Sequence, residues 1–473
     1  MEIKDLKQQD VFYWFEQLEQ FPRESGNEKA VSDFLVKFAK ERNLDVYQDD
    51  TYNVIIRKQA TKGYENSPTI AIQGHMDMVC VKEDDSNHDF TKDPIELVVD
   101  GDYLKANKTS LGADDGIAVA YGLAVLDSNE IEHGPLELVI TTQEETSMGG
   151  VSALDTSKIT AKYLLNIDSE EEGEFTVGCA GGLEVRSTFK KEFESPNGEF
   201  VEIKISGLTG GHSGMEIDKY RKNGIKEIAR IIYNLEDYRI ASIHGGSKKN
   251  AIATNGYAIV EVKDSEKALE KLEEIKEIVM HEAKATDPDI KIEINKTKFD
   301  KDVLTKELSK NIVEFLYTIP YGLFNKDLEL NTLTSSANIG ILEEDDEKIE
   351  ANAFVRSSIE SEKQNYAHQI GTVALSHGAQ ISYENGYPGW EKEESSLIGL
   401  CQDTYKEITG KDSIVTTTHG GLECGFLKTA LKDTEMISFG PNLSDVHTTR
   451  EKVEIKSVER IYEFLIELLK KLK

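Results

Sequence analysis

Short apolar runs and helical patterns alternate through roughly the first 180 residues of the chain. The runs 69–73 and 136–141 have the length and composition of buried strands. Apolar residues of 31–39 recur at helical spacing, and the segment 116–126 is apolar throughout. Alternation of this kind is typical of a sheet covered by helices. We therefore predict an α/β fold with a mixed, mostly parallel sheet flanked by helices.

The middle of the chain has a different pattern, in which alternating strands surround amphipathic helices. Between 183 and 294 the order is ββαββαβ, which is typical of an open-faced α+β sandwich. A similar order recurs more weakly between 305 and 383, which predicts two degenerate α+β halves. The acidic run Glu343–Glu347 is expected to be a solvated turn between two strands of the second half.

A chain of 473 residues exceeds the roughly 250 to 300 residues that one compact core supports, so we expect two domains. The α/β pattern assigns 1–183 and 390–473 to one discontinuous domain, which ends in an amphipathic helix. Residues 184–389 then form an inserted α+β domain.

Composition excludes several classes of partner. The chain has 55 Lys and Arg against 87 Asp and Glu, a formal net charge of −32, whereas nucleic-acid and membrane-surface binders depend on clustered basic residues. No apolar run approaches the roughly 18 residues of a membrane span, and the start of the chain does not resemble a signal peptide. The four cysteines are scattered and form no CxxC pair. We expect a cytoplasmic protein that binds neither nucleic acid nor membranes.

Polar groups that could carry chemistry follow the predicted buried strands. His75 and Asp77 follow the run 69–73, and because residues two apart on a strand face the same side, both can reach one site. Asp77 could accept a hydrogen bond from a metal-bound His75. An incidental polar rim at the end of the strand is the alternative.

Adjacent carboxylates occur at two more places. Asp114 and Asp115 precede the apolar helix, where capping explains one of them better than both. Glu144 and Glu145 follow the run 136–141, and the pattern alone does not decide which of the two faces a pocket.

A fourth strand ends at Asp168, and a strand-like run through Gly440-Pro441 leads to His447. Two histidines and several carboxylates without thiolates suit two divalent ions, with Zn²⁺ as the first candidate and Co²⁺ or Mn²⁺ as alternatives. Two other catalytic patterns are broken, the nucleophile elbow at Met215 and the zincin pair at Ala285.

Several motifs occur in an order that resembles the M20 family of dinuclear metallopeptidases, and in particular its aminoacyl-histidine dipeptidase branch. The motifs are GHMDMV, LGADDGI, TTQEETSMGG, NIDSEE, GLTGGHSG, GYPGW, HGGLECG and GPN…VHTT. The resemblance covers nearly the whole chain. One departure is Asp115, which stands where the branch often has Asn.

The resemblance implies a role for each matching residue. His75, Asp114 and Asp168 would bind one metal ion, and Asp114, Glu145 and His447 the other, so that Asp114 bridges the two. Glu144 matches the general base, and Asp77 matches the carboxylate behind His75.

The inserted domain matches the family's lid, through which the family suggests a homodimer. There His212 would reach the scissile carbonyl, while Asn250 and Arg356 would hold the free carboxylate of a small peptide. Without the resemblance, a surface salt bridge is the simpler reading of Arg356. The implied activity is hydrolysis of dipeptides, including Xaa-His dipeptides such as β-Ala-His. The alternatives are an N-acyl amino-acid deacylase and a non-catalytic metal-binding protein.

Overall fold

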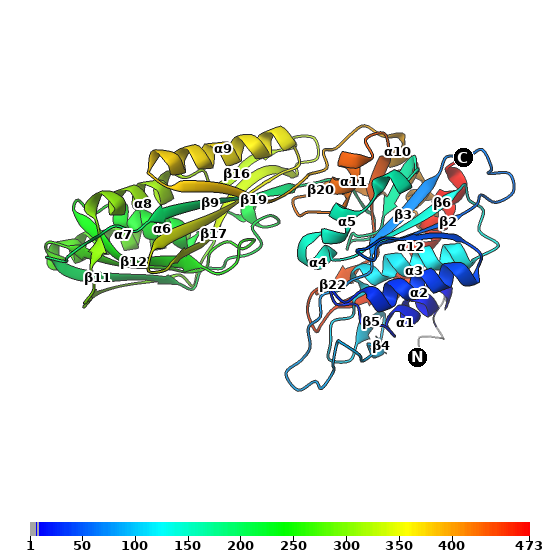
Figure 1. The fold of residues 1–473 in the computed structure, drawn as a ribbon, viewed down its shortest axis with the longest axis horizontal. Helices are drawn as coiled ribbons and strands as arrows, with labels where there is room; N and C mark the ends of the chain where they lie inside the picture. The colour runs from blue at the N-terminus through cyan, green and yellow to red at the C-terminus, as the bar shows by residue number, and fades with distance from the viewer. Residues whose placement is uncertain (1–5, 7–8) are drawn as a thin grey trace. The chain divides into compact units, whose positions relative to one another are not determined.

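The computed structural model describes residue 6 and residues 9–473, and it divides the chain into two compact units (Figure 1). The first unit contains the described residues through Gly178 together with Lys392–Thr417 and Leu422–Lys473. The second contains Cys179–Glu391 and the short segment Thr418–Gly421. Each unit has its own sheet.

The sheet of the first unit has eight strands, and only its central strands are parallel. β6, β3, β7 and β21 pair in parallel, while β1 pairs with β2, β2 with β6 and β21 with β8 in the antiparallel sense. The mixed α/β fold is therefore confirmed, with parallel pairing at the centre. The order across the sheet is β1 (Asp45–Gln48), β2 (Val54–Lys58), β6 (Leu136–Thr141), β3 (Ile70–His75), β7 (Tyr163–Asn166), β21 (Glu435–Ser438), β8 (Glu174–Cys179) and β20 (Ile414–Thr418).

The helices of this unit bury its apolar residues. The apolar helix α3 (Ala113–Asp127) packs against β3 and against α1 (Gln9–Leu18), and its Tyr121 ring stacks on Tyr462 of α12 (Ile455–Lys471). All six residues of β3 and of β6 are buried, as expected for strands covered on both faces. The remaining helices are α2 (Lys29–Glu41), α4 (Glu144–Ser147), α5 (Gly149–Ala153), α10 (Ser396–Thr409) and α11 (Cys424–Ala430).

A small four-stranded sheet completes the first unit. Its order is β22 (Leu443–Ser444), β23 (Lys452–Glu454), β5 (Tyr103–Ala106) and β4 (Leu97–Asp100), so it joins the C-terminal part of the chain to the segment before α3. Among the described residues, no helix is both long and apolar enough to cross a membrane.

The second unit contains one nine-stranded sheet built from two halves of similar topology. In chain order each half runs strand, helix, strand, strand, helix, strand, and in each the spatial order of the four strands is fourth, first, third, second. That is the ferredoxin-like arrangement. The first half has β11 (Glu199–Ser206), α6 (Gly224–Tyr233), β12 (Tyr238–Gly246), β13 (Gly256–Val262), α7 (Ser265–Ala283) and β14 (Lys291–Thr297).

The second half of the sheet is interrupted by the first. Its opening strand β9 (Gly181–Lys190) precedes the first half in sequence, and the rest follows it: α8 (Lys306–Thr318), β17 (Leu333–Glu344), β18 (Lys348–Ser357), α9 (Glu360–Ser376) and β19 (Gln380–Tyr387), with β16 (Gly322–Lys326) paired to β17. The halves join where β12 pairs with β17, and their helices lie in a row on one face (Figure 1). Residues 345–347 are exposed between β17 and β18, which confirms a turn there, but Glu343 and Glu344 of the predicted run belong to β17.

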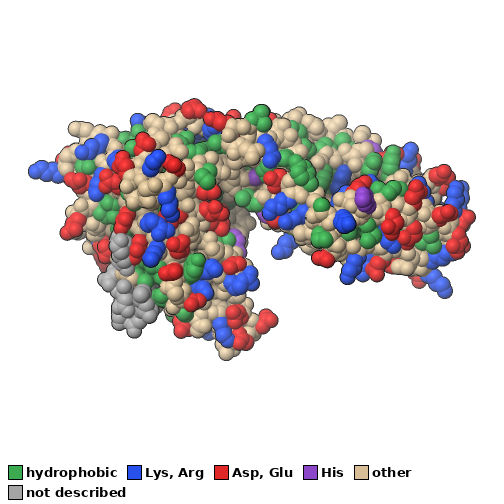
Figure 2. All heavy atoms as spheres, turned by 180° about the vertical axis from the view of Figure 1, so that it is seen from behind, with side chains coloured by type: hydrophobic (Ala, Val, Ile, Leu, Met, Phe, Trp, Pro, Cys, Tyr) green, Lys and Arg blue, Asp and Glu red, His purple; other side chains and the backbone are tan. Residues whose placement is uncertain are grey.

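Acidic side chains are interspersed with basic and apolar ones over the face seen in Figure 2. On that face the negative charge of the chain is therefore spread out.

One glycine controls how closely two loops of the first unit approach. A Cβ added to Gly440, just after β21, would overlap the carbonyl oxygen of Ser169, which follows β7 and Asp168. The loop after β21 and the loop carrying Asp168 therefore touch backbone to backbone.

We predict that Gly440→Ala lowers the free energy of unfolding by about 1–3 kcal/mol, because the backbone oxygen cannot move aside cheaply. Gly399→Ala is the matched control: it lies in α10, its Cβ would meet open space, and it should stabilise by about 0.5–1 kcal/mol. Urea unfolding of both variants measures the two effects. Equal effects of the two substitutions would contradict this account.

Candidate active site

Polar residues from five chain segments meet at the carboxyl ends of the parallel strands in the first unit. His75 is the last residue of β3, Glu144 and Glu145 begin α4 after β6, and Asp168 lies two residues past β7. Asp114 stands at the start of α3 in a non-helical conformation, and the peptide bond that follows it is cis. His447 comes from the loop between β22 and β23. The carboxyl edge of the sheet thus brings together the polar residues that were selected because they follow predicted strands.

Asp114 lies between the two histidines. Its Oδ1 is 3.3 Å from Nε2 of His75, and its Oδ2 is 3.1 Å from Nε2 of His447. His447 Nε2 is also 3.0 Å from Oε2 of Glu145, and His75 Nε2 is 3.8 Å from Oδ1 of Asp168. Two ligands about 2.0 Å from a tetrahedral ion are about 3.3 Å apart, so the spacing of these nitrogen and oxygen donors fits bound divalent ions.

Asp77 supports this cluster from behind and is fully buried. Its Oδ1 is 3.4 Å from Nδ1 of His75, and its two carboxylate oxygens accept the amide hydrogens of Glu144 and Glu145 at 3.1 and 3.2 Å. Ser25 donates a further hydrogen bond of 2.7 Å to Asp77 Oδ2. Nδ1 of His75 also lies 3.1 Å from the Asp77 carbonyl oxygen. Asp77 therefore orients the imidazole through both its backbone and its carboxylate, and the same carboxylate holds the turn that carries the two glutamates.

Burial sets the electrostatics of the cluster. Burial raises the pKa of Glu144 to about 8, and Glu423, Glu145 and Asp114 add to this while His75 opposes it. Burial likewise raises the pKa of Asp168, aided by Asp115. Burial also disfavours the ionised form of Asp114, but hydrogen bonds from His447 and His75 outweigh it and hold its pKa below the usual range. Crowded acids of this kind favour a bound cation.

The donors form two groups that could each hold a metal ion. One is His75, Asp114 and Glu145, and the other is His75, Asp115 and Asp168, with donor atoms within 4.8 Å of one another in each group. Asp115 is buried, and its Oδ2 accepts the amide hydrogen of His75 at 3.2 Å. The sequence indicates Asp115 as one of two adjacent acids before the helix, where capping is an alternative, and as a departure from the family pattern, but it does not indicate that Asp115 contacts His75.

In the second unit, His212 and Arg356 are neighbours. Arg356 on β18 is buried, its Nη2 is 3.4 Å from Nε2 of His212, and its Nη1 donates to the Tyr387 hydroxyl at 3.2 Å. Among the described residues no carboxylate lies within ion-pair distance of Arg356, and its Nε has no hydrogen-bond partner. A buried guanidinium without an anion is costly, so this environment suits an anionic ligand.

Both ring nitrogens of His212 have a neighbouring donor. The Met215 amide donates to Nδ1 at 3.1 Å, and Nη2 of Arg356 lies 3.4 Å from Nε2. Burial and the neighbouring Arg356 lower the pKa of His212 to about 4, which keeps the ring neutral near pH 7. With Nδ1 accepting from Met215, Nε2 is the ring nitrogen that remains to interact with a ligand. Asn250 shares a pocket of about 240 Å³ with His212.

His419 joins this cluster from a distant part of the sequence. It lies in Thr418–Gly421, which belongs to the second unit, and its buried Nε2 is 2.7 Å from the Ser336 hydroxyl oxygen. A Cβ at Gly214 would lie 2.7 Å from the His419 carbonyl oxygen and 3.1 Å from Cε1 of His212, so glycine permits this close packing. The motif containing His419 was recognised in the sequence, but nothing there indicated its neighbours.

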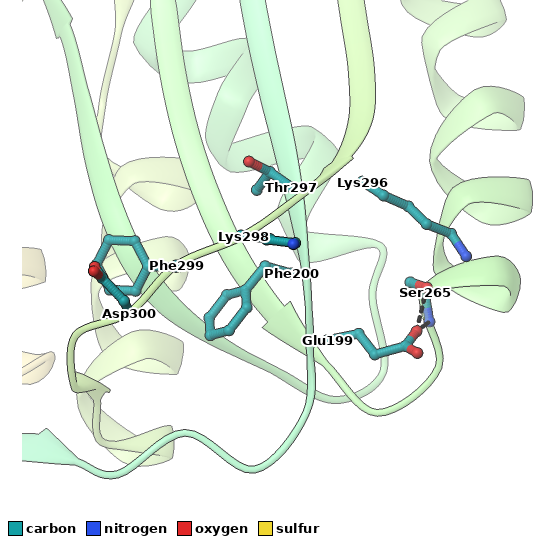
Figure 3. A pocket seen from close by; sticks show the side chains of 8 residues that line it. All are labelled: Glu199, Phe200, Ser265, Lys296, Thr297, Lys298, Phe299 and Asp300. Atoms are coloured by element: carbon teal, nitrogen blue, oxygen red, sulfur yellow. Dashed lines mark hydrogen bonds between the residues drawn. The ribbon is translucent and has the colours of Figure 1, made fainter.

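Another pocket, of about 700 Å³, lies near β11 and β14 in the second unit (Figure 3). Its wall includes Phe200, Phe299 and Lys298, and the Glu199 carboxylate is bonded to Ser265. Its residues form no metal-ligating group among those that the structure describes.

Residues 71–471 match the family model described as peptidase family M20/M25/M40. The chain belongs to this family. The resemblance carried by the sequence motifs is therefore confirmed, and the candidate metal-binding residues belong to those motifs.

This M20 peptidase is 34% identical over 485 aligned residues to the cytosol non-specific dipeptidase of Escherichia coli, covering 100% of this chain and 99% of the relative. The crystal structure of an aminoacylhistidine dipeptidase from Vibrio alginolyticus superposes with a TM-score of 0.92 at 33% identity, covering 100% of this chain and 98% of that one. An aminopeptidase from Bacillus cereus shares the fold, with a TM-score of 0.58 at 18% identity and 99% of each chain covered.

Buried neutral imidazoles make the second unit sensitive to acid. Burial, with contributions from Arg356 and His212, lowers the pKa of His419 to about 3, so the unfolded chain binds the proton first as the pH falls below about 6.5. The stability due to neutral His419 is complete above that pH and is lost as the pH falls towards 3. We predict that the contribution of His419 to the free energy of unfolding falls by roughly 1.4 kcal/mol per pH unit between pH 6 and 4.

Urea unfolding can measure this, because Trp390 is one of only two tryptophans and Trp14→Phe leaves it as the reporter of the second unit. His419→Asn should make the free energy of unfolding depend less steeply on pH between pH 6 and 4, whatever its effect on the stability at pH 7. The exposed His368, replaced by Asn, is the control for losing one imidazole. An unchanged slope in His419→Asn would refute the assignment.

Proposed function

We propose that this M20 peptidase is a metal-dependent dipeptidase that hydrolyses unblocked dipeptides, including Xaa-His dipeptides, with Glu144 as general base. The observation that carries the proposal is the position of Asp114, which has one oxygen beside His75 and the other beside His447. The names of the two full-length relatives support the substrate class.

The proposed metal ligands are His75, Asp114, Glu145, Asp168 and His447, with Asp77 orienting His75. When bound there, a pair of divalent ions would polarise the peptide carbonyl and lower the pKa of a water molecule towards neutrality. The donor set of imidazoles and carboxylates favours Zn²⁺, with Co²⁺ and Mn²⁺ as alternatives.

Glu144 is the proposed proton carrier. It is largely buried beside the ligands, and Asp77 fixes its backbone amide. Its carboxylate would take a proton from the attacking water and deliver it to the leaving amine. Cations nearby would lower its pKa from the raised value of the metal-free cluster towards the neutral range, where a carboxyl group can both accept and donate.

His212 and Arg356 are the proposed substrate-handling residues of the second unit, together with Asn250. The neutral His212 ring would donate from Nε2 to the oxygen that becomes negative in the transition state. Arg356 would pair with the free carboxylate of the substrate, which supplies the anion that this buried guanidinium otherwise lacks. An enzyme built in this way requires a free C-terminal carboxylate.

Two further properties follow as proposals. We infer a cytoplasmic location, because the Escherichia coli relative is named a cytosol dipeptidase. We also infer a homodimer, on the basis of the family resemblance, and light scattering of the purified protein would test it.

Separate substitutions distinguish the general base from the metal ligands. We expect Glu144→Gln to lower kcat by about 10²–10⁴-fold while both metal ions remain bound, and Asp114→Asn to lose metal as well as activity. Metal content measured by mass spectrometry beside kcat tests this. The exposed Glu171, replaced by Gln, is the control for removing one nearby charge. Near-normal turnover of Glu144→Gln would disprove its role.

Substrate panels test the specificity. Arg356→Met should reduce kcat/KM for dipeptides by about 10²-fold and change it little for dipeptide amides, which lack the carboxylate. Arg186→Met is a matched control on the neighbouring strand β9, where the arginine already pairs with Glu350 and Glu384. Equal cleavage of tetrapeptides would refute dipeptide specificity, and preference for N-acetyl amino acids would indicate a deacylase.

A further inference from the structure

Glu451 is a buried carboxylate that the proposed reaction does not use. Although it lies more than 330 positions further along the chain, it accepts hydrogen bonds from four consecutive backbone amides at the start of α3. The N···O distances are 2.7 Å from Leu111, 3.0 Å from Gly112, 2.8 Å from Ala113 and 3.4 Å from Asp114. The last of these residues is the proposed bridging ligand.

The amides of 111–114 point to one carboxylate because this turn lies at the helix N-terminus, where such groups lack partners within the helix. The helix has no side-chain cap of its own at Gly112. Burial excludes water, so Glu451 is the group that satisfies these donors.

Arg23 holds the same turn through its carbonyl side. This fully buried arginine donates from Nη2 to the Gly112 carbonyl oxygen at 2.7 Å and forms an ion pair with Glu19. Its Nη1 donates to the Met76 carbonyl oxygen at 3.2 Å, next to Asp77. The turn before Asp114 is therefore fixed by charged groups through both its amide and its carbonyl groups.

Glu451 also belongs to the loop that carries the proposed ligand His447. Only three residues separate the two, and the Glu451 amide donates to the Thr448 carbonyl oxygen at 3.2 Å within that loop. Immediately after it, β23 pairs with β5. One residue thus connects the loop of His447 directly to the turn of Asp114.

We propose that Glu451 is a positioning residue that sets Asp114 relative to His447, so that the two residues converge on one metal ion. This inference rests on the proposed function, because it takes both residues as ligands. A carboxylate is needed, since its two oxygens accept from four amides, whereas the amide of Gln offers one acceptor oxygen and would direct N–H groups at other donors.

The test compares Glu451→Gln with Glu454→Gln, a half-buried carboxylate three residues further along that bonds Asn442. Binding of Zn²⁺ and Co²⁺ to the metal-free proteins is measured by calorimetry, and the visible absorption of the Co²⁺ forms reports ligand geometry. We expect Glu451→Gln to bind metal about 10–100-fold more weakly and to change the Co²⁺ spectrum. Its kcat should fall more than its KM rises, while Glu454→Gln should match the parent in all three measurements.

A merely structural cap would give a different result. In that case the metal-free Glu451→Gln protein would have a lower Tm, but it would bind metal with unchanged affinity and an unchanged Co²⁺ spectrum, which would overturn the proposal. Should Glu451→Gln fail to fold, Glu451→Asp keeps the charge and shortens the reach, and it should show an intermediate loss of metal affinity. Failure of the parent protein itself to bind metal or to cleave dipeptides would count against the proposed function instead.

Discussion

Mutual repulsion among carboxylates at one edge of a buried sheet is the constraint on which the first unit depends. Asp114, Glu145, Asp168 and the neighbouring Glu144 lie close together with little exposure to water. Protons or cations must offset their charge, and burial makes the acids hold protons more tightly in the absence of an ion. The positions of Asp77, Arg23 and Glu451 around this cluster follow from the need to keep such a group in place.

The same requirement distributes charge among the buried groups that surround these carboxylates. Arg23 is the buried cation that faces Glu19, and the backbone amides of 111–114 face Glu451. Partial charges on backbone groups are therefore used where a further buried cation would be costly. In the second unit the situation is reversed, because the buried Arg356 has no acidic partner among the described residues. The first unit thus has buried acids in excess, and the second has a buried cation without an acidic partner among the described residues.

Much of the fold was accessible from sequence because it depends on local periodicity. The segments 116–126 and 136–141 were predicted in type and place, since an apolar helix and an apolar strand have clear patterns. The residues at strand ends could also be selected, because parallel strands bring their carboxyl ends to one edge. Which of Glu144 and Glu145 faces the site depended on the resemblance, since both begin the short helix α4.

Contacts between distant segments could not be predicted. Glu451 meets the turn at 111–114 and His419 meets Ser336 only because the chain folds back over long stretches of sequence. A lone buried acid after a histidine has no spacing that indicates its partners. The direction of the outer strands could not be predicted either, because burial patterns do not encode strand direction: β1 pairs with β2, β2 with β6 and β8 with β21 in the antiparallel sense.

The interrupted topology of the second unit has a consequence for how the chain reaches its native state. The first half, β11 to β14, is continuous in sequence. β9 precedes it, but its partner β18 comes after it in the chain. The two-stranded ladder between β10 (Phe193–Glu194) and β15 (Val303–Leu304) closes the neck of this insertion. Once the inserted half is compact, its two ends lie near each other. Little further conformational entropy is then lost when β9 pairs with β18. The connectivity therefore favours formation of the inner half before the outer half closes around it.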